Sequence, residues 1–84
     1  MPVVNWLYNM KLKMIRETGT IKMLSNQCRE VWNGHAYWPN YFQKGNVYPY
    51  TSKRIDEDNG KPYSYEVDWA TIYARDCEPV INAA

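Results

Sequence analysis

The chain has 84 residues, which suffices for one domain but leaves no room for separate catalytic and binding lobes. Hydrophobic residues make up 45% of it and charged residues 23%, close to the averages of soluble globular proteins. Neither a disordered chain nor a disulfide-dense scaffold is therefore indicated. We expect a single domain over residues 1–84, with its core in residues 20–80.

The net charge is only +1, but it is distributed unevenly. Residues 1–54 carry eight basic and two acidic side chains, whereas residues 55–84 carry two basic and seven acidic ones. An acidic mimic of nucleic acid would be negative over its whole surface, so the charge distribution argues against this class. A basic face for nucleic acid stays open as a hypothesis.

No apolar run approaches the ~20 residues needed to span a bilayer, and the start of the chain lacks the pattern of a signal peptide. We therefore expect a cytoplasmic protein without a membrane partner. Cys28 and Cys77 are too few for a disulfide framework, so two free, largely packed thiols are expected. Together with the single His35 they do not supply a zinc site, and we expect no metal or cofactor.

The first eighteen residues fit two interpretations. Pro2 at a first-turn position, Gly19 beyond the end and apolar residues near helical spacing favour a helix over residues 1–18. The alternative is a strand over residues 11–16, with Leu12 and Met14 facing inward, that turns at residues 17–19. The sequence does not decide between them.

The rest of the chain predicts short strands. Residues 20–25 alternate as a strand, and turn signals at Asn33-Gly34 and Pro39-Asn40 indicate one long loop over residues 26–45. Residues 46–55 predict a strand in which Pro49 requires an edge or a bulge. Asn59-Gly60 then predicts a hairpin tip.

The next segment has the clearest period of two. Large side chains alternate with polar ones, which predicts a strand with one buried face made of Tyr63, Tyr65, Val67 and Trp69. Residues 71–77 fit a further strand or a short helix. We favour the strand, because β-branched and aromatic residues fill its start. The predicted class is thus mainly β, either a small antiparallel barrel or a strongly bent sheet.

Short motifs at residues 21–26 and 41–49 resemble a loose group of small phage-encoded proteins, as do the tip at 58–61 and the segment 77–80. Members of that group look like small SH3-like barrels. The resemblance covers about residues 20–80 and implies an SH3-like fold. It also implies a phage accessory protein that acts on a host factor.

Catalytic motifs are absent from the sequence. The four glycines are far apart and none precedes a Lys-Ser or Lys-Thr pair, so no phosphate-binding loop is present. His35 stands between Gly34 and Ala36, and the sequence offers no oriented partner for it. The acidic run at residues 56–58 lacks the spacing of a calcium loop. We expect a protein that is not an enzyme.

Aromatic residues are the unusual feature, at 15% of the chain, and many fall between positions 32 and 50. So small a core cannot absorb them all, and exposed Trp, Tyr and Arg side chains dominate protein interfaces. The predicted partner-binding residues are Arg29, Trp32, Tyr37, Trp38, Tyr41, Tyr48, Tyr50, Lys53 and Arg54. We expect them to bind and occlude a host protein, for example an enzyme or a defence complex.

The alternative is a small β-barrel that binds single-stranded nucleic acid, because bases stack on aromatic rings and basic side chains follow phosphates. The residues for that function would be Tyr37, Trp38, Tyr41, Lys44, Lys53 and Arg54. Salt separates the two hypotheses, since phosphate contacts weaken steeply with ionic strength.

Overall fold

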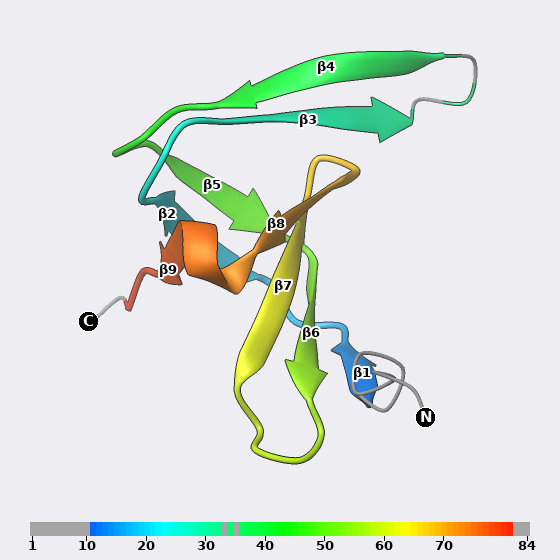
Figure 1. Ribbon diagram of the computed structural model, residues 1–84, viewed down its shortest axis with the longest axis vertical. Helices are drawn as coiled ribbons and strands as arrows, with labels where there is room; N and C mark the ends of the chain where they lie inside the picture. Colours follow the sequence, from blue (N-terminus) through cyan, green and yellow to red (C-terminus); the bar gives the residue numbers. More distant parts are fainter. Residues whose placement is uncertain (1–10, 33, 35, 82–84) are drawn as a thin grey trace, which may run out of the picture.

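The computed structural model describes residues 11–32, 34 and 36–81, and within them it is built from strands (Figure 1). The elements in chain order are β1 (Leu12–Ile15), β2 (Gly19–Met23), β3 (Gln27–Trp32), β4 (Tyr37–Phe42), β5 (Val47–Tyr50), β6 (Ser52–Asp56), β7 (Pro62–Val67), β8 (Ala70–Tyr73), the 3-10 turn η1 (Ala74–Asp76) and β9 (Cys77–Pro79). Every pairing between these strands is antiparallel. The predicted mainly β class is confirmed.

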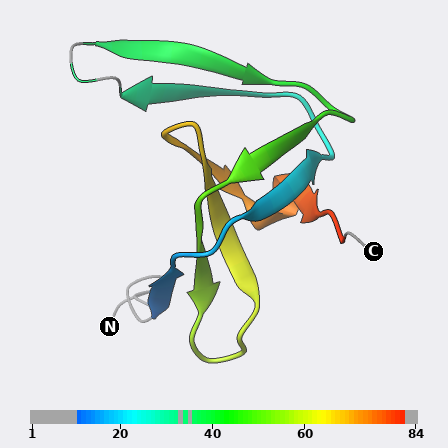
Figure 2. The same cartoon turned by 180° about the vertical axis from the view of Figure 1, so that it is seen from behind.

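The strands form three sheets. Four strands pair in the order β1-β6-β7-β8, three in the order β5-β2-β9, and the β3–β4 hairpin stands alone. The first two sheets, which we call the body, form two layers that Figures 1 and 2 show from opposite sides. Only Thr51 separates β5 from β6, so the chain passes from one layer to the other at a sharp bend. The hairpin extends away from both layers.

The core lies between the two layers of the body and reaches Phe42 at the base of the hairpin. Its buried side chains are Ile21, Met23, Phe42, Tyr50, Tyr65, Val67, Ala70, Ile72 and Cys77. The rings of Tyr50 and Tyr65 come from different sheets and lie 4.8 Å apart between centroids. Tyr50 also faces Gly19 across the β2–β5 ladder, where a side chain on residue 19 would collide with its ring. The layers are therefore held together by a few large, closely packed residues.

The long loop predicted over residues 26–45 is wrong. This segment forms a regular hairpin in which β3 and β4 pair over six residues each, from Gln27–Phe42 to Trp32–Tyr37. Pro39 and Asn40 are turn signals in isolation, but both lie within β4. Both strands lack a second neighbour among the described residues, so Pro39 is tolerated as it is on any edge strand.

Of the two interpretations for the start of the chain, the strand is found over Leu12–Ile15, paired with β6. Residues 1–10, which carried most of the helix hypothesis, lie outside the described residues. The predicted inward orientation of Leu12 and Met14 is wrong, because they are 38% and 47% exposed. β1 is an edge strand that adds to the body without covering its core.

Tyr65 and Val67 are buried as predicted on β7, but the strand ends earlier than expected. Val67 pairs with Ala70, which leaves Asp68 and Trp69 as a two-residue turn. Trp69 is therefore 79% exposed, and its predicted place on the buried face is wrong. Tyr63, at the start of the strand, is 37% exposed.

Other turns follow the sequence more closely. Pro49 lies on β5, an edge strand of its sheet, as its missing N–H requires. The β6–β7 tip contains Gly60 with φ of +71°, a conformation that glycine adopts without strain. The strand predicted over residues 71–77 is β8 only up to Tyr73, after which the chain makes the η1 turn.

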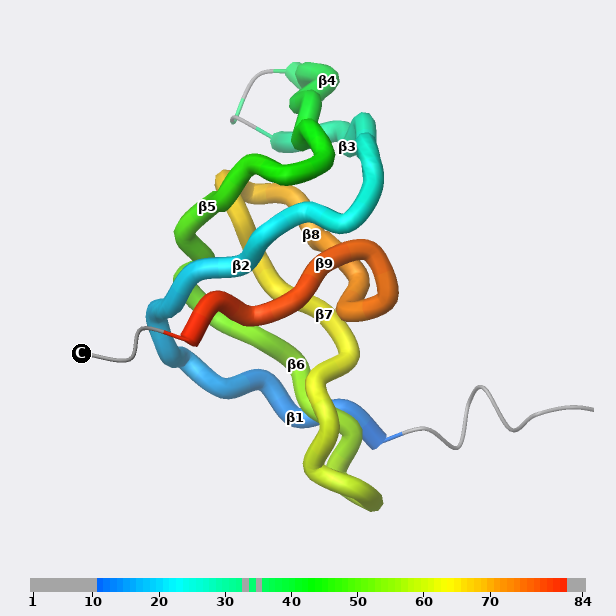
Figure 3. The backbone as a smooth tube through the Cα atoms, turned by 90° about the vertical axis from the view of Figure 1, so that its left-hand side faces the viewer, coloured from blue at the N-terminus to red at the C-terminus, as the bar shows by residue number. Residues whose placement is uncertain are grey.

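The described strands do not join into a closed barrel, because the ladders of the two body sheets remain separate. Among the described helical segments, none has the length and apolar character to cross a membrane. Figure 3 shows the β3–β4 hairpin at one end of the molecule, where the chain leaves the body after β2 and returns to it at β5.

Candidate functional site

The β3–β4 hairpin has two faces that its register defines. Residues directly opposite each other in an antiparallel pair share a face, and successive residues alternate between faces. One face carries Cys28, Glu30, Trp32, Tyr37, Pro39 and Tyr41, and the other carries Gln27, Arg29, Val31, Trp38, Asn40 and Phe42. The second set includes the hairpin residues that pack on the body, so we call it the inner face and the first set the outer face.

The inner face fastens the hairpin to the body. Phe42 is 2% exposed and meets the ring of Tyr48 edge to face, with 5.0 Å between centroids. Val31 packs against the core cluster. These apolar contacts stabilise the attachment of the hairpin through buried area.

Arg29 adds a polar contact on the same face. Its Nη2 donates to Oδ2 of Asp76 in η1 at 3.0 Å, and its guanidinium lies 5.1 Å from the centre of the Tyr73 ring. A half-buried ion pair that also stacks on an aromatic ring holds the side chain in one position. Arg29, predicted as a partner-binding residue, is therefore a link between the hairpin and the body.

The outer face is open. Trp32, Tyr37 and Tyr41 are 46%, 65% and 66% exposed, and we call these three residues the outer aromatic face. The rings of Trp32 and Tyr37 lie 5.2 Å apart at an angle of 48°, a tilted pair within the usual range of aromatic contacts. Trp38 is also exposed, at 54%, but it lies on the inner side of the hairpin.

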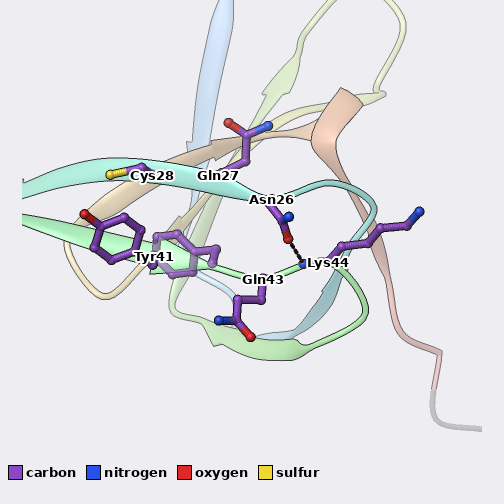
Figure 4. A pocket seen from close by; sticks show the side chains of 7 residues that line it. Asn26, Gln27, Cys28, Tyr41, Gln43 and Lys44 are labelled. Carbon is purple, nitrogen blue, oxygen red and sulfur yellow. Dashed lines mark hydrogen bonds between the residues drawn. The ribbon is translucent and has the colours of Figure 1, made fainter.

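A hollow of about 560 Å³ adjoins the outer aromatic face at the base of the hairpin (Figure 4). Its lining residues are Asn26, Gln27, Cys28, Tyr41, Phe42, Gln43 and Lys44. The N–H of Lys44 donates to Oδ1 of Asn26 at 2.7 Å, which fixes the two chain segments on either side. Figure 4 shows Cys28 and Tyr41 together at one end, while the Lys44 side chain extends away from them.

The other predicted site residues lie on the body. Tyr48 is half-buried, and its hydroxyl accepts a hydrogen bond from the N–H of Gln43 at 3.0 Å. Tyr50 is 8% exposed and belongs to the core. Lys53 and Arg54 form ion pairs of 2.6 Å with Glu17 and Glu66. The structure thus brings Trp32, Tyr37 and Tyr41 together, and it places the predicted cations in existing pairs.

Two buried titratable groups of the body, Cys77 and Tyr65, have raised pKa values. Within the described part of the chain no cluster of His, Cys, Asp and Glu has the geometry to hold a metal ion. Burial, with the charge of Asp76 as a smaller cause, raises the pKa of Cys77 to about 11, so this thiol stays protonated. Burial likewise raises the pKa of Tyr65 to about 12, with smaller contributions from Cys77, Tyr50 and Glu17.

The sequence did not lead us to predict the exposure of two residues. Cys28 is exposed beside Tyr41, and Trp69 is exposed at the β7–β8 turn. The signal for the first was present, because Asn33-Gly34 is a residue pair that strongly favours a hairpin turn. For Trp69 the sequence contained no comparable signal, because Asp-Trp is not a residue pair that favours a tight turn.

No family model matches the chain, and neither the curated proteins nor the solved structures contain a match.

Proposed function

We propose that this chain is a non-enzymatic binding module that covers a surface of a protein partner with its outer aromatic face. The observation that carries the proposal is the exposure of Trp32, Tyr37 and Tyr41 on one face of a hairpin. Such rings bury much area with little loss of rotamer freedom, which is why they are enriched at the energetic centres of interfaces. The inner face holds the hairpin in place, so little ordering is required on binding.

The mode of action proposed is occlusion. A phage-like accessory protein that lies across a host enzyme or defence complex in the cytoplasm would block it without chemistry of its own. The proposed architecture is SH3-like, and two features support it. The chain crosses from one sheet to the other at the bend between β5 and β6, and the 3-10 turn η1 precedes the last strand, β9.

The experiment is a capture assay with three forms of the protein. Wild type, the Tyr37→Ala/Tyr41→Ala variant and the Trp38→Ala variant are immobilised and exposed to a bacterial lysate. The third is the matched control, because Trp38 is similarly exposed on the same hairpin but on the opposite face. The captured protein is then purified, and its affinity for each form is measured by calorimetry.

We expect the outer-face variant to lose about thirtyfold in affinity or more, because two aromatic anchors are removed, while Trp38→Ala binds as wild type does. Equal affinities for all three forms would contradict the proposal. A loss confined to Trp38→Ala would transfer the site to the inner face.

Single-stranded nucleic acid remains the second candidate, and the hollow at the base of the hairpin favours it by placing Tyr41 and Lys44 in one lining. Against it, Lys53 and Arg54 are engaged with Glu17 and Glu66 in the body. Fluorescence anisotropy with a labelled oligothymidylate tests it. Binding that falls steeply between about 50 mM and 200 mM salt would establish phosphate contacts and replace the protein-binding proposal.

A further inference from the structure

The β7–β8 turn holds the largest exposed aromatic side chain of the body in an unfavourable backbone conformation. Asp68 and Trp69 have φ of 52° and 68°. A two-residue hairpin turn of type I′ requires a positive φ at both of its central positions. Aspartate tolerates a positive φ comparatively well. A bulky tryptophan does not, and the second position is the one that glycine usually occupies.

Nothing in the described part of the chain compensates for this strain. Trp69 is 79% exposed, and its ring has no aromatic or cationic neighbour among the described residues. Its burial therefore contributes little to stability, while its backbone strain reduces stability. Strained residues of this kind cluster at ligand-binding and catalytic sites. The exposed indole is therefore better explained by binding of a ligand than by packing within the chain.

A pocket beside the indole indicates the chemistry of that ligand. It has a volume of about 380 Å³ and is lined by Thr51, Ser52, Glu66, Asp68 and Trp69. The Glu66 carboxylate already accepts from Nη1 of Arg54 at 2.6 Å and from Oγ1 of Thr71 at 2.8 Å. The Asp68 carboxylate has no hydrogen bond or ion pair with any described residue.

The pocket thus combines one flat aromatic face, one uncompensated carboxylate and two hydroxyl groups. An arginine side chain matches this set, because its planar guanidinium stacks on an indole and donates several hydrogen bonds in one plane. An anionic ligand would meet the charge of Asp68 at the same position. A purely apolar ligand would leave the carboxylate and the hydroxyl groups without partners.

We propose that the Asp68–Trp69 turn is a binding site for an arginine side chain presented by a protein partner. The guanidinium stacks on Trp69 and donates to the Asp68 carboxylate, with Thr51 and Ser52 at the rim. This site lies on the body, at the β7–β8 loop seen beneath β3 in Figure 1, and does not involve the residues of the outer aromatic face. The proposed arginine site therefore does not depend on the proposed function of the outer aromatic face.

The test uses short peptides as probes and NMR of the full chain as readout. Gly-Arg-Gly and Gly-citrulline-Gly, both with blocked ends, are titrated while the indole N–H signal of Trp69 is followed. Citrulline has nearly the shape of arginine but no charge. We expect saturable movement of the signal with the arginine peptide and at least about fivefold weaker binding of the citrulline peptide.

Two variants and one control sharpen the result. Asp68→Asn is expected to weaken arginine binding about fivefold, whereas Asp58→Asn, which removes the same charge from the β6–β7 tip, leaves it unchanged. Trp69→Gly is expected to abolish binding and to raise the melting temperature, because glycine relieves the positive φ. In this variant binding is read from the backbone amide signals of Thr51 and Ser52.

Three results would overturn the proposal. They are equal binding of the arginine and citrulline peptides, equal effects of Asp68→Asn and Asp58→Asn, and unchanged arginine binding by a folded Trp69→Gly protein. Because Trp69→Gly is expected to be more stable than wild type, its loss of binding cannot be attributed to unfolding.

Discussion

The β3–β4 hairpin and the body use the same kinds of residue in opposite ways. In the body, Tyr50 and Tyr65 lie between two sheets and are 8% and 2% exposed. In the hairpin, Tyr37 and Tyr41 are 65% and 66% exposed although they lie on regular strands. The inner face of the two-stranded hairpin packs on the body, but no described element covers its outer face. The outer side chains therefore remain in solvent.

We therefore expect substitutions in the outer aromatic face to change affinity for a partner with little change in the stability of the fold. The buried residues of the body support the fold and are poor candidates for contacts with a partner, whereas the side chains of the outer aromatic face are exposed. Exposed aromatic side chains gathered on one face of a soluble chain indicate an interaction surface. The following predictions test this separation, from the largest expected effect on stability to the smallest.

Phe42→Ala acts where the two regions join and should have the largest effect. Phe42 is 2% exposed and packs edge to face on Tyr48, so its removal leaves a cavity at the base of the hairpin. We expect the free energy of unfolding to fall by about 3–5 kcal/mol, measured by urea denaturation. A loss below about 1 kcal/mol would mean that the hairpin is not anchored through this ring.

Gly19→Ala tests the close contact between β2 and β5. A Cβ on residue 19 would lie 2.6 Å from Cζ and 2.8 Å from Cε2 of Tyr50, which is too close for carbon atoms. We expect the free energy of unfolding to fall by about 1–3 kcal/mol. Adding Tyr50→Phe removes the hydroxyl group nearest the new methyl and should recover part of the loss. Simple additivity of the two substitutions would show that the Tyr50 hydroxyl group is not the cause of the loss.

Each region contains one free thiol, Cys28 in the hairpin and Cys77 in the body. The pKa of Cys77 is raised from 9.0 to about 11, so above pH 9 the unfolded chain releases this proton before the folded chain does. Stability is therefore complete below pH 9 and falls as the pH rises towards 11. Tyr65 adds a fall between pH 10 and about 12. The urea midpoint measured against pH should show this decline, with a shallower slope for Cys77→Ala.

Alkylation provides the complementary measurement on the hairpin. Cys28 is exposed and Cys77 is 4% exposed, so iodoacetamide at neutral pH should modify Cys28 first, as peptide mass spectrometry would show. Equal rates for the two thiols would contradict the assignment of Cys77 to the core.

Tyr37→Ala and Tyr41→Ala should have the smallest effect on stability. Both side chains are mainly in solvent, so we expect each substitution to change the free energy of unfolding by less than about 1 kcal/mol. Thermal denaturation followed by circular dichroism measures this. A larger loss would mean that the outer aromatic face supports the fold, and it would weaken the case for a binding role.

Much of the body was predictable because its signals are local. The alternation around Tyr65 and Val67, the edge position of Pro49 and the glycine at the β6–β7 tip all depend on neighbouring residues. The hairpin was missed because Pro39 and Asn40 indicate a turn in isolation. On an unpaired edge they are tolerated within a strand.

The candidate site was predicted only in part. An excess of aromatic side chains over the capacity of the core predicted that some rings would be exposed, and Trp32, Tyr37 and Tyr41 are. Which rings, and which cations accompany them, depended on distant contacts. Arg29 meets Asp76, 47 positions away, and Arg54 meets Glu66. No local pattern predicts those pairs.

The mainly β class and the excess of aromatic residues follow from the sequence alone, because strand periodicity and composition are properties of short segments. The tertiary structure decided which rings are buried. The Tyr50 ring lies between two sheets, Tyr41 lies on a ribbon covered on one side, and Trp69 stands on a turn. Burial depends on which strands the fold brings together, and that choice is made over the whole chain rather than within any one segment.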